Sequence, residues 1–355
     1  MITADDAKVQ NLTLKTTDNT TNFFTASVRV SAGQSTLHKC RITSTWGGGV
    51  GIYGSSTNPT LTDCNIFGCK HYGIYVAESG KGVLENCEIY DNMGDGIVVA
   101  PFGKGDPNVI GCKIYNGKSK GIFICSDGKG TFENCEVYGN ASDGMMVAYN
   151  GDTKVTKCKF YDGRSTGIFI NSDGNGTFDN CDVYGNTESG IRVSSNGDPK
   201  VTKCRFYNGV DAGISVDNDG KGTFSNCEVH GNAKAGIYVA SNGNPKFSGC
   251  KIYNGKASGI FIFESGKGLF ENCDVYGNTK YGILVATNGN PTIRNCRIRN
   301  HQNTGIYVYE QGRGTYLNNT FFGNLTYDLY FRPGDCGQYV ANGNRDERGG
   351  LLQPR

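Results

Sequence analysis

Residues 130–147 read GTFENCEVYGNASDGMMV, and residues 153–170 read TKVTKCKFYDGRSTGIFI. Each stretch contains two short runs in which apolar and polar residues alternate, the period of a half-buried strand. Glycine, asparagine and aspartate separate the runs, as turns require. The sequence shows no sustained apolar pattern with the period of a helix. We therefore expect units of two or three short strands without a helix.

The cysteine at the centre of each unit recurs along most of the chain. After early steps of 24 and 25 residues, the interval is 23 residues from Cys112 onward. A fixed period of about 20 to 50 residues is typical of stacked repeats, in which each unit buries its apolar face against its neighbours. These ruler cysteines are Cys40, Cys64, Cys87, Cys112, Cys135, Cys158, Cys181, Cys204, Cys227, Cys250, Cys273 and Cys296.

The period predicts an all-β fold, a single-stranded right-handed parallel β-helix of about fourteen rungs, with Leu12 and Asn319 in the first and last ruler positions. We expect one continuous domain. Residues 1–39 would form N-terminal rungs or a cap, residues 40–325 the regular repeats, and residues 326–355 a C-terminal cap and tail.

The residue after each ruler cysteine points outward, because side chains alternate along a strand. From residue 88 its charge alternates at every rung, which favours attraction between neighbouring rungs and fixes their register. The third residue after the cysteine is mostly aromatic, and is interpreted as a supporting ladder of rings or as a platform for sugars or a partner. The charged series is Glu88, Lys113, Glu136, Lys159, Asp182, Arg205, Glu228, Lys251, Asp274 and Arg297.

A second strand in each unit carries an outward residue between two inward apolar residues. Nine of these eleven outward residues are apolar or aromatic, which is unusual for positions facing solvent and indicates a contact surface or a face covered by the tail, including Tyr327 and Leu329–Phe331. We call the series the outer stripe. It consists of Tyr75, Val98, Phe123, Met146, Phe169, Arg192, Ser215, Tyr238, Phe261, Leu284 and Tyr307.

The outer stripe is interrupted on adjacent rungs by Arg192 and Ser215. Glu188 and Asp211 lie just before the corner glycines of the same rungs, and Asp217 occupies a position that is mostly Ala, Ser, Asn or Cys elsewhere. A pair of carboxylates can act as acid and base on a glycosidic bond, and an arginine can neutralise or deprotonate a uronate. The alternative is an ion-pair cluster in which Arg192 meets Glu188 and Asp211.

The combined pattern resembles β-helix repeats of the carbohydrate-binding and sugar-hydrolysis type. It carries Gly-Lys-Gly turns before Phe/Leu-Glu-Asn-x-Glu/Asp-Ile/Val-Tyr, then Gly-Ile-x-Val, then Asn-Pro before Cys-x-Ile-Tyr-Asn-Gly, across about residues 40–325. It is most similar to the β-helix region of F-box-only proteins, and more distantly to pectate-lyase-like enzymes and periplasmic copper-maturation proteins. The first resemblance implies recruitment of a protein, although this sequence has no F-box-like helical segment. The second implies action on a polysaccharide.

Composition restricts the remaining possibilities. A net charge of +2 gives no basic field for nucleic acid, and no apolar run is long enough to span a membrane. The start of the chain lacks the features of a signal peptide, and an inward ladder of cysteines suits reduced thiols, so we expect a reducing, cytoplasmic location. Four scattered histidines predict no metal site, and no cofactor is expected. The oligomeric state stays open.

Two functions from different classes follow, and a third, a purely structural rod, would require the outer stripe to be covered. The first is a non-catalytic recognition scaffold that binds a protein or glycan along the outer stripe, at Tyr75, Phe123, Met146, Phe169, Ser215, Tyr238, Phe261 and Tyr307. The second is a polysaccharide lyase or glycoside hydrolase that uses Arg192, Asp211, Asp217 and Glu188.

Overall fold

The computed structural model describes residues 7–17, 25–99 and 104–354. The chain divides into two compact units, Met1–Asp182 and Val183–Arg355, and each is described by itself. Part of the expected N-terminal region, residues 1–6 and 18–24, lies outside the described residues. The described residues form strands and turns without a helix, so none of them belongs to a helix that could cross a membrane.

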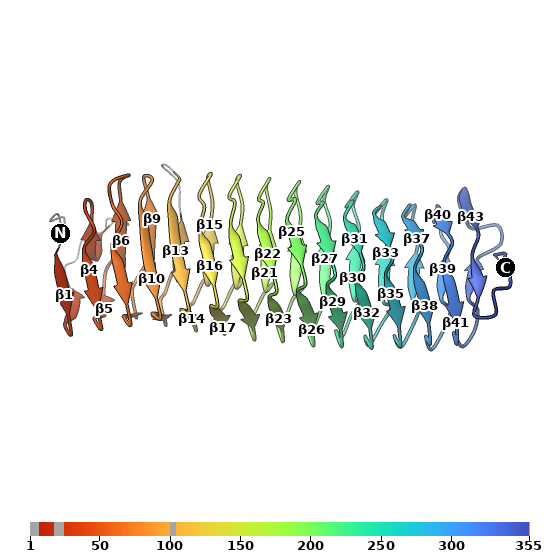
Figure 1. The fold of residues 1–355 in the computed structure, drawn as a ribbon, viewed down its shortest axis with the longest axis horizontal. Helices are drawn as coiled ribbons and strands as arrows, with labels where there is room; N and C mark the ends of the chain where they lie inside the picture. Colours follow the sequence, from red (N-terminus) through yellow and green to blue (C-terminus); the bar gives the residue numbers. More distant parts are fainter. Residues whose placement is uncertain (1–6, 18–24, 100–103, 355) are drawn as a thin grey trace. The chain divides into compact units, whose positions relative to one another are not determined.

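Unit 1 is built from three parallel sheets, and the chain visits each sheet once per rung (Figure 1). Sheet 1 contains β1 (Lys8–Gln10), β4 (Thr36–His38), β7 (Thr60–Thr62), β10 (Lys81–Glu85), β13 (Asp106–Ile110), β16 (Thr131–Glu133), β19 (Lys154–Thr156) and β22 (Thr177–Asp179). Sheet 2 contains β2 (Thr13–Thr16), β5 (Arg41–Ser44), β8 (Asn65–Phe67), β11 (Glu88–Tyr90), β14 (Lys113–Tyr115), β17 (Glu136–Tyr138) and β20 (Lys159–Tyr161). Sheet 3 contains β3 (Ala26–Val30), β6 (Gly48–Tyr53), β9 (Ile74–Ala77), β12 (Ile97–Val99), β15 (Ile122–Ile124), β18 (Met145–Val147) and β21 (Ile168–Ile170).

Unit 2 repeats this plan, and the unit boundary falls within β23 (Asp182–Tyr184). Sheet 1 contains β25 (Lys200–Thr202), β28 (Thr223–Ser225), β31 (Lys246–Ser248), β34 (Leu269–Glu271), β37 (Thr292–Arg294), β40 (Gly314–Leu317) and β43 (Tyr339–Asn342). Sheet 2 contains β26 (Arg205–Tyr207), β29 (Glu228–His230), β32 (Lys251–Tyr253), β35 (Asp274–Tyr276), β38 (Arg297–Arg299), β41 (Thr320–Phe322) and β44 (Arg345–Asp346). Sheet 3 contains β24 (Ile191–Val193), β27 (Ile214–Val216), β30 (Ile237–Val239), β33 (Ile260–Ile262), β36 (Ile283–Val285), β39 (Ile306–Val308) and β42 (Leu329–Phe331).

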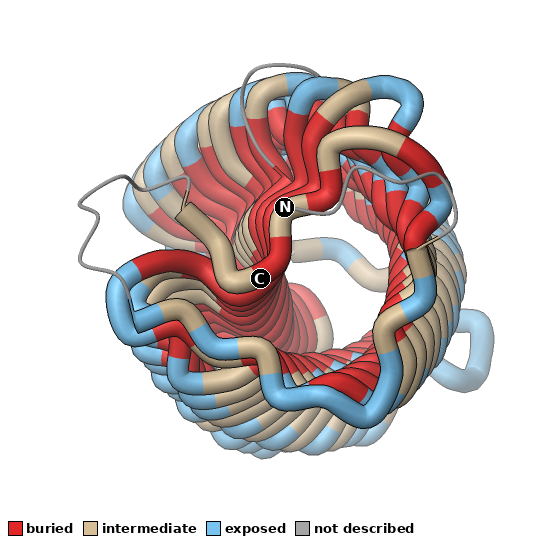
Figure 2. Tube along the Cα trace, turned by 90° about the vertical axis from the view of Figure 1, so that its left-hand side faces the viewer, coloured by how far each residue is buried: buried red, intermediate tan, exposed pale blue. Residues whose placement is uncertain are grey.

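Each unit is therefore a right-handed parallel β-helix, and the predicted fold class is confirmed. Strands of neighbouring rungs pair in register at the predicted period, as Ile237 with Ile260 and Val239 with Ile262 show. The ruler cysteines and the inward apolar residues are buried, and in each unit these buried positions face the inside of the coil (Figure 2). Each ruler thiol also donates to a backbone carbonyl, for example from Cys135 Sγ to Val109 O at 3.5 Å.

The residue directly before each ruler cysteine lies in a turn and has a positive φ. Asn226 and Asn272 have φ of 55°, in the left-handed region that asparagine and glycine adopt most readily among the residue types. One such residue is enough to turn the chain from sheet 1 into sheet 2, for example between β28 and β29.

The corner glycines before sheet 3 are needed for close approach rather than for an unusual bend. A Cβ on Gly259 would lie 2.7 Å from Asn278 Nδ2 and 2.8 Å from Gly282 O. Neighbouring rungs therefore pack too closely at this corner for any side chain at Gly259.

The ladders predicted on the outer face of sheet 2 are confirmed. In unit 2, Lys251 Nζ lies 3.0 Å from Glu228 Oε1, and Arg297 Nη2 lies 3.0 Å from Asp274 Oδ2. The rings stack face to face, as in unit 1, where the Tyr115 and Tyr138 centroids lie 4.9 Å apart with their planes 1° from parallel.

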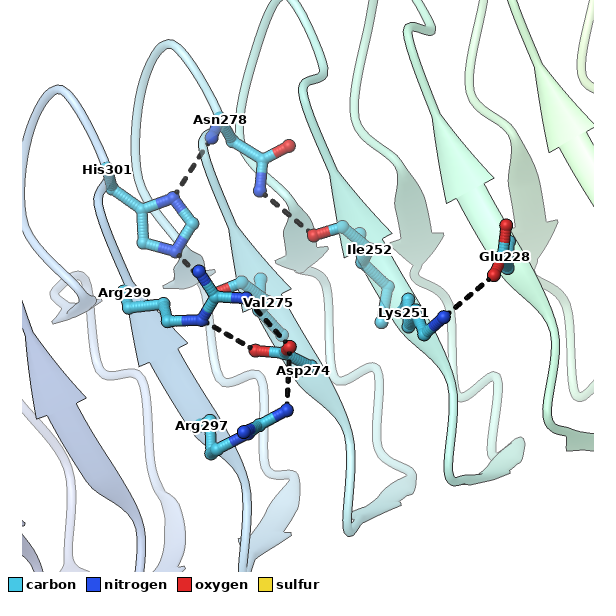
Figure 3. A network of polar contacts seen from close by, with 9 residues as sticks. All are labelled: Glu228, Lys251, Ile252, Asp274, Val275, Asn278, Arg297, Arg299 and His301. Atoms are coloured by element: carbon cyan, nitrogen blue, oxygen red, sulfur yellow. Dashed lines mark hydrogen bonds and ion pairs between the residues drawn. The ribbon is translucent and has the colours of Figure 1, made fainter.

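Asparagines in the turn after sheet 2 bond to the preceding rung rather than to one another. Asn278 Oδ1 accepts from Gly255 N at 2.9 Å, and its Nδ2 donates to Ile252 O. His301 occupies the same position one rung later, where the alternate rungs carry glycine, as at Gly209 and Gly255. Its Nδ1 accepts from the backbone N–H of Asn278 at 3.2 Å, and its Nε2 lies 3.1 Å from Val275 O (Figure 3). The imidazole is therefore a neutral tautomer with its proton on Nε2.

Leu12 holds the first ruler position, because Arg41 N donates to Leu12 O as Asn65 N donates to Cys40 O, although the Leu12 side chain is 53% exposed. Two expectations were wrong. Tyr75, Val98 and Ser215 of the outer stripe were expected to face solvent, but all three are buried. The segment Leu329–Phe331 does not cover the outer stripe, because β42 pairs with β39 and adds Tyr330 beside Tyr307 as a further member.

The burial of Tyr75 has a local cause. Its ring packs in a cluster with Tyr53 and Tyr72 on the outer side of sheet 3 in unit 1. The glycine-rich strand β6 makes room for this cluster, because a Cβ on Gly48 would overlap the ring of Tyr72. At Tyr75, the outer stripe is therefore covered by neighbouring tyrosine side chains and is not exposed to solvent.

Candidate functional site

Unit 2 contains a groove of about 700 Å³ on the outer side of sheet 3. It is formed by β24, β27, β30 and β33 together with the loops that lead into these strands. The groove coincides with the interruption of the outer stripe that the sequence shows at Arg192 and Ser215. Its lining consists of Thr187, Glu188, Ser189, Arg192, Val210, Asp211, Ala212, Ser215, Asp217, Lys234, Ala235, Tyr238 and Phe261.

In-register pairing explains why residues 23 positions apart meet in this groove. Arg192 pairs with Ser215, and Ser215 pairs with Tyr238, so the three side chains project from the same face of adjacent strands. The loop residues before the corner glycines are brought together in the same way. Glu188, Asp211 and Lys234 occupy equivalent positions on three successive rungs.

Asp217 is the most strongly held acid of the groove. Its carboxylate accepts from Arg192 Nε at 2.9 Å and from Arg192 Nη2 at 3.2 Å, a two-point contact. The hydroxyl of Ser215 lies 3.4 Å from the same carboxylate. The Asp217 side chain is 10% exposed, whereas that of Arg192 is 40% exposed. The pair therefore presents the guanidinium toward the groove opening and keeps the carboxylate beneath it.

Asp211 has a different cationic partner from the one expected. Lys234 Nζ lies 2.9 Å from Asp211 Oδ1, and Ser189 Oγ lies 3.4 Å from Asp211 Oδ2. The Lys234 side chain is 73% exposed, so solvent screens this pair. The hydrogen bond to Asp211 raises the pKa of Lys234. The predicted cluster joined Arg192 to both Glu188 and Asp211; the structure pairs Asp211 with Lys234, and Arg192 with Asp217.

Aromatic rings form the C-terminal side of the groove. Tyr238 and Phe261 are half-buried, and their rings meet edge to face with centroids 5.7 Å apart. Burial raises the pKa of Tyr238, and the nearby acids Glu264, Asp217 and Asp211 raise it further. The Tyr238 hydroxyl therefore stays protonated at neutral pH and is available as a hydrogen-bond donor.

The structure gathers seven of the residues proposed from the sequence into this groove and leaves five elsewhere. Those gathered are Glu188, Arg192, Asp211, Ser215, Asp217, Tyr238 and Phe261. Tyr307 lies farther along sheet 3 of unit 2. Tyr75, Phe123, Met146 and Phe169 belong to unit 1.

Sequence reasoning missed Lys234. The sequence signal was a change of residue type two positions before the corner glycines. Three successive rungs carry a charged residue there (Glu188, Asp211 and Lys234), whereas the two preceding rungs carry Ser142 and Ser165. Within the described residues, no group of three or more histidine, cysteine or acidic side chains has an arrangement that could hold a metal ion.

Comparison with known proteins identifies the fold family. The family described as "Right handed beta helix region" matches residues 10–104, 102–244 and 189–345. The A-module of the mannuronan C-5 epimerase AlgE6 of Azotobacter vinelandii is similar in structure, with a TM-score of 0.59 and 15% identity over 91% of this chain and 92% of the module. The AlgE4 A-module of the same organism gives 0.58 and 15% over 88% and 91%. At this identity the likeness concerns the fold. The chain belongs to the right-handed β-helix family.

Proposed function

We propose that this chain hydrolyses a polysaccharide of neutral sugars in the groove of unit 2. One observation carries the proposal: Glu188, Asp211 and Asp217 line a single groove beside the rings of Tyr238 and Phe261. Glycoside hydrolysis needs two carboxyl groups on either side of the glycosidic bond, and aromatic side chains offer flat apolar surfaces for sugar rings.

The charge balance favours a neutral sugar over a uronate. The groove lining contains three carboxylates and two cations. Arg192 and Lys234 are each within 3 Å of a carboxylate oxygen. A uronate that approached either cation would meet the carboxylate already paired with it, and it would add negative charge to a lining that has one more carboxylate than cations. Lyase chemistry on an acidic polymer is therefore the weaker alternative.

The contacts suggest which acid acts as the base or nucleophile and which acts as the proton donor. The two bonds from Arg192 fix the position of the Asp217 carboxylate, which suits Asp217 as the base or nucleophile. Glu188 lies at the exposed side of the groove, where it can approach a leaving-group oxygen as the proton donor, with Asp211 as the other candidate. The protonated Tyr238 hydroxyl would orient a sugar hydroxyl.

The similar structures support the broad class. Both are mannuronan C-5 epimerases, so this architecture acts on polysaccharides in those proteins. They carry no information on the sugar that this chain would take, because 15% identity does not preserve a site.

The test is incubation of the full chain with neutral and acidic polysaccharides, followed by two readouts on each. Release of reducing ends measures any cleavage, whereas ultraviolet absorbance of unsaturated uronate ends measures elimination alone. We expect reducing ends from a neutral polymer without unsaturated ends, and a loss of at least about 100-fold in the Asp217→Asn variant. Unsaturated ends from an acidic polymer would instead establish the lyase alternative.

Recognition of a glycan without turnover is the second candidate. It is favoured by the pairing of both Asp211 and Asp217 with cations, because carboxylates held in this way can serve as fixed hydrogen-bond acceptors for sugar hydroxyls. This candidate predicts binding of a polysaccharide by wild type with no cleavage in either assay.

A further inference from the structure

Unit 2 carries a second series of aromatic side chains that begins at the groove and continues toward β42. We call it the aromatic track. It extends the outer stripe and includes residues that the sequence pattern did not single out. Its members are Phe261, Phe263, Tyr281, Tyr307, Tyr309 and Tyr330, and all are half-buried.

In-register pairing makes the track continuous with the groove. Tyr238 pairs with Phe261, Phe261 with Leu284, Leu284 with Tyr307, and Tyr307 with Tyr330. Four steps of about 4.8 Å place Tyr330 roughly 19 Å from Tyr238 along the stacking direction. One end of the track is therefore part of the proposed catalytic groove, through Phe261.

Most ring pairs of the track are arranged differently from those of sheet 2. On sheet 2, Tyr253 and Tyr276 stack with planes 1° apart and centroids 4.8 Å apart, so each ring covers the face of the next. On the track, Phe261 and Phe263 are inclined by 38° and Tyr307 and Tyr330 by 39°, whereas Tyr307 and Tyr309 stack with planes 11° apart. Inclined rings leave part of each face uncovered, and a ring face is the surface against which the C–H groups of a pyranose pack.

The track also has a two-rung period. Phe263 and Tyr309 occupy the position that Asp217 holds in its own rung, and they are 46 residues apart. The rungs before and between them carry Ala240 and Ala286 at this position, both buried. At this position, large rings therefore recur on every second rung, about 10 Å apart. A sugar unit of an extended chain is about as long as one rung, so the spacing matches every second sugar.

Resting on the proposed function, we infer that the groove is one end of a multi-subsite track that binds a linear, neutral glycan along the direction in which the rungs stack. Affinity then depends on chain length, because each added sugar reaches further along the track. A protein partner is a poorer fit, since half-buried rings that repeat along one direction match a polymer with a repeating unit.

The experiment is calorimetric titration of the full chain with cello-, xylo- and manno-oligosaccharides, each from disaccharide to octasaccharide. We expect affinity for one series to rise with length until the track is filled. The Phe263→Ala/Tyr309→Ala double variant should bind the hexasaccharide about ten-fold more weakly and the disaccharide as wild type does. The matched control, Tyr253→Ala/Tyr276→Ala, removes two rings of sheet 2 and should bind both as wild type does.

The outcomes separate this inference from the proposed function. Length-dependent binding that the track variant weakens supports the track, with or without turnover. Cleavage of a polymer together with length-independent affinity, or with an unchanged track variant, overturns the track and leaves the proposed function standing. Absence of binding in all three series overturns the track, and absence of cleavage in the polysaccharide assays overturns the proposed function separately.

Discussion

The outer faces of sheet 2 and sheet 3 in unit 2 are built on the same rungs and carry aromatic residues at the same period, yet they differ in how those residues are used. On sheet 2, rings stack face to face and opposite charges alternate, as Tyr253 with Tyr276 and Glu228 with Lys251 show. On sheet 3 the regular series is interrupted at Arg192 and Ser215, and a groove lies at the interruption. The comparison teaches that a feature repeated on every rung supports the fold, whereas a departure from the repeat marks a candidate site.

The sharpest way to break this comparison is to neutralise one aspartate on each face. Asp217 and Asp274 both accept two bonds from an arginine, and their side chains are 10% and 12% exposed. We expect Asp217→Asn to reduce polysaccharide cleavage by at least about 100-fold, because it removes a reacting group. Asp274→Asn should leave cleavage unchanged and lower the free energy of unfolding by about 1 to 2 kcal/mol, measured by urea denaturation. Equal loss of cleavage in the two variants would mean that the groove is not the site of cleavage.

A substitution at the corner between the two sheets should damage both faces at once. Gly259→Ala places a methyl group 2.7 Å from Asn278 Nδ2 and 2.8 Å from the Gly282 carbonyl oxygen. The rungs must separate to accept it, and we expect a loss of about 2 to 4 kcal/mol in the free energy of unfolding. Thermal denaturation checks this directly. Gly334→Ala serves as a control for steric overlap, because a Cβ there meets nothing within 4 Å. It is an imperfect control, because φ at Gly334 is 73°, which an alanine adopts only with strain. An unchanged melting temperature for Gly259→Ala would show that the corner is looser than the packing implies.

A third prediction concerns the pH dependence of stability and tests the bonds that His301 makes to the preceding rung in the turn after sheet 2. Burial lowers the pKa of His301 from 6.5 to about 4. The unfolded chain therefore takes up a proton here at a higher pH than the folded chain does. The contribution of His301 to stability is complete above pH 6.5 and is lost as pH falls toward 4, by at most about 3 kcal/mol.

The measurement is urea denaturation of wild type and of His301→Asn between pH 4 and 7. Asparagine makes equivalent bonds at position 278, so the variant should fold, and it should lack the His301 share of the pH dependence. The two proteins should differ in slope between pH 4 and 6.5 and run in parallel above that range. Identical slopes would contradict a neutral, buried imidazole at His301.

The smallest predicted effect separates the two kinds of aromatic residue. Tyr253→Ala removes a ring stacked between His230 and Tyr276. It should lower the free energy of unfolding by about 1 kcal/mol, because both ring faces lose a partner. Glycan affinity should not change, since sheet 2 lies outside the groove. Calorimetry of the same sample checks both statements, and weaker glycan binding would move the site to sheet 2.

The fold could be predicted almost completely from the sequence, because the 23-residue interval fixes which residues stack. Once Arg192, Ser215 and Tyr238 are known to be one rung apart, their common face follows from strand geometry. The two acids Asp211 and Asp217 could be found for the same reason, as departures from a series that is otherwise regular.

What could not be predicted depends on side-chain packing. Lys234 resembles the surface lysines of many turns, and its pairing with Asp211 becomes visible only when the side chains are placed. Tyr75 was expected outside because alternation decides the face of a residue but not what covers that face. The inclination of Phe263 against Phe261 was beyond the pattern for a similar reason, since ring orientation is set by neighbours on several rungs.

The most direct test of the account is a crystal structure of the Asp217→Asn variant with an oligosaccharide of the series that binds best. We predict sugar rings in the groove between Glu188 and Tyr238, with the chain continuing over Phe263 on sheet 3 of unit 2. A well-ordered oligosaccharide on the tyrosine ladder of sheet 2, or anywhere that leaves the groove empty, would contradict the claim that the break in the repeat is the site of action.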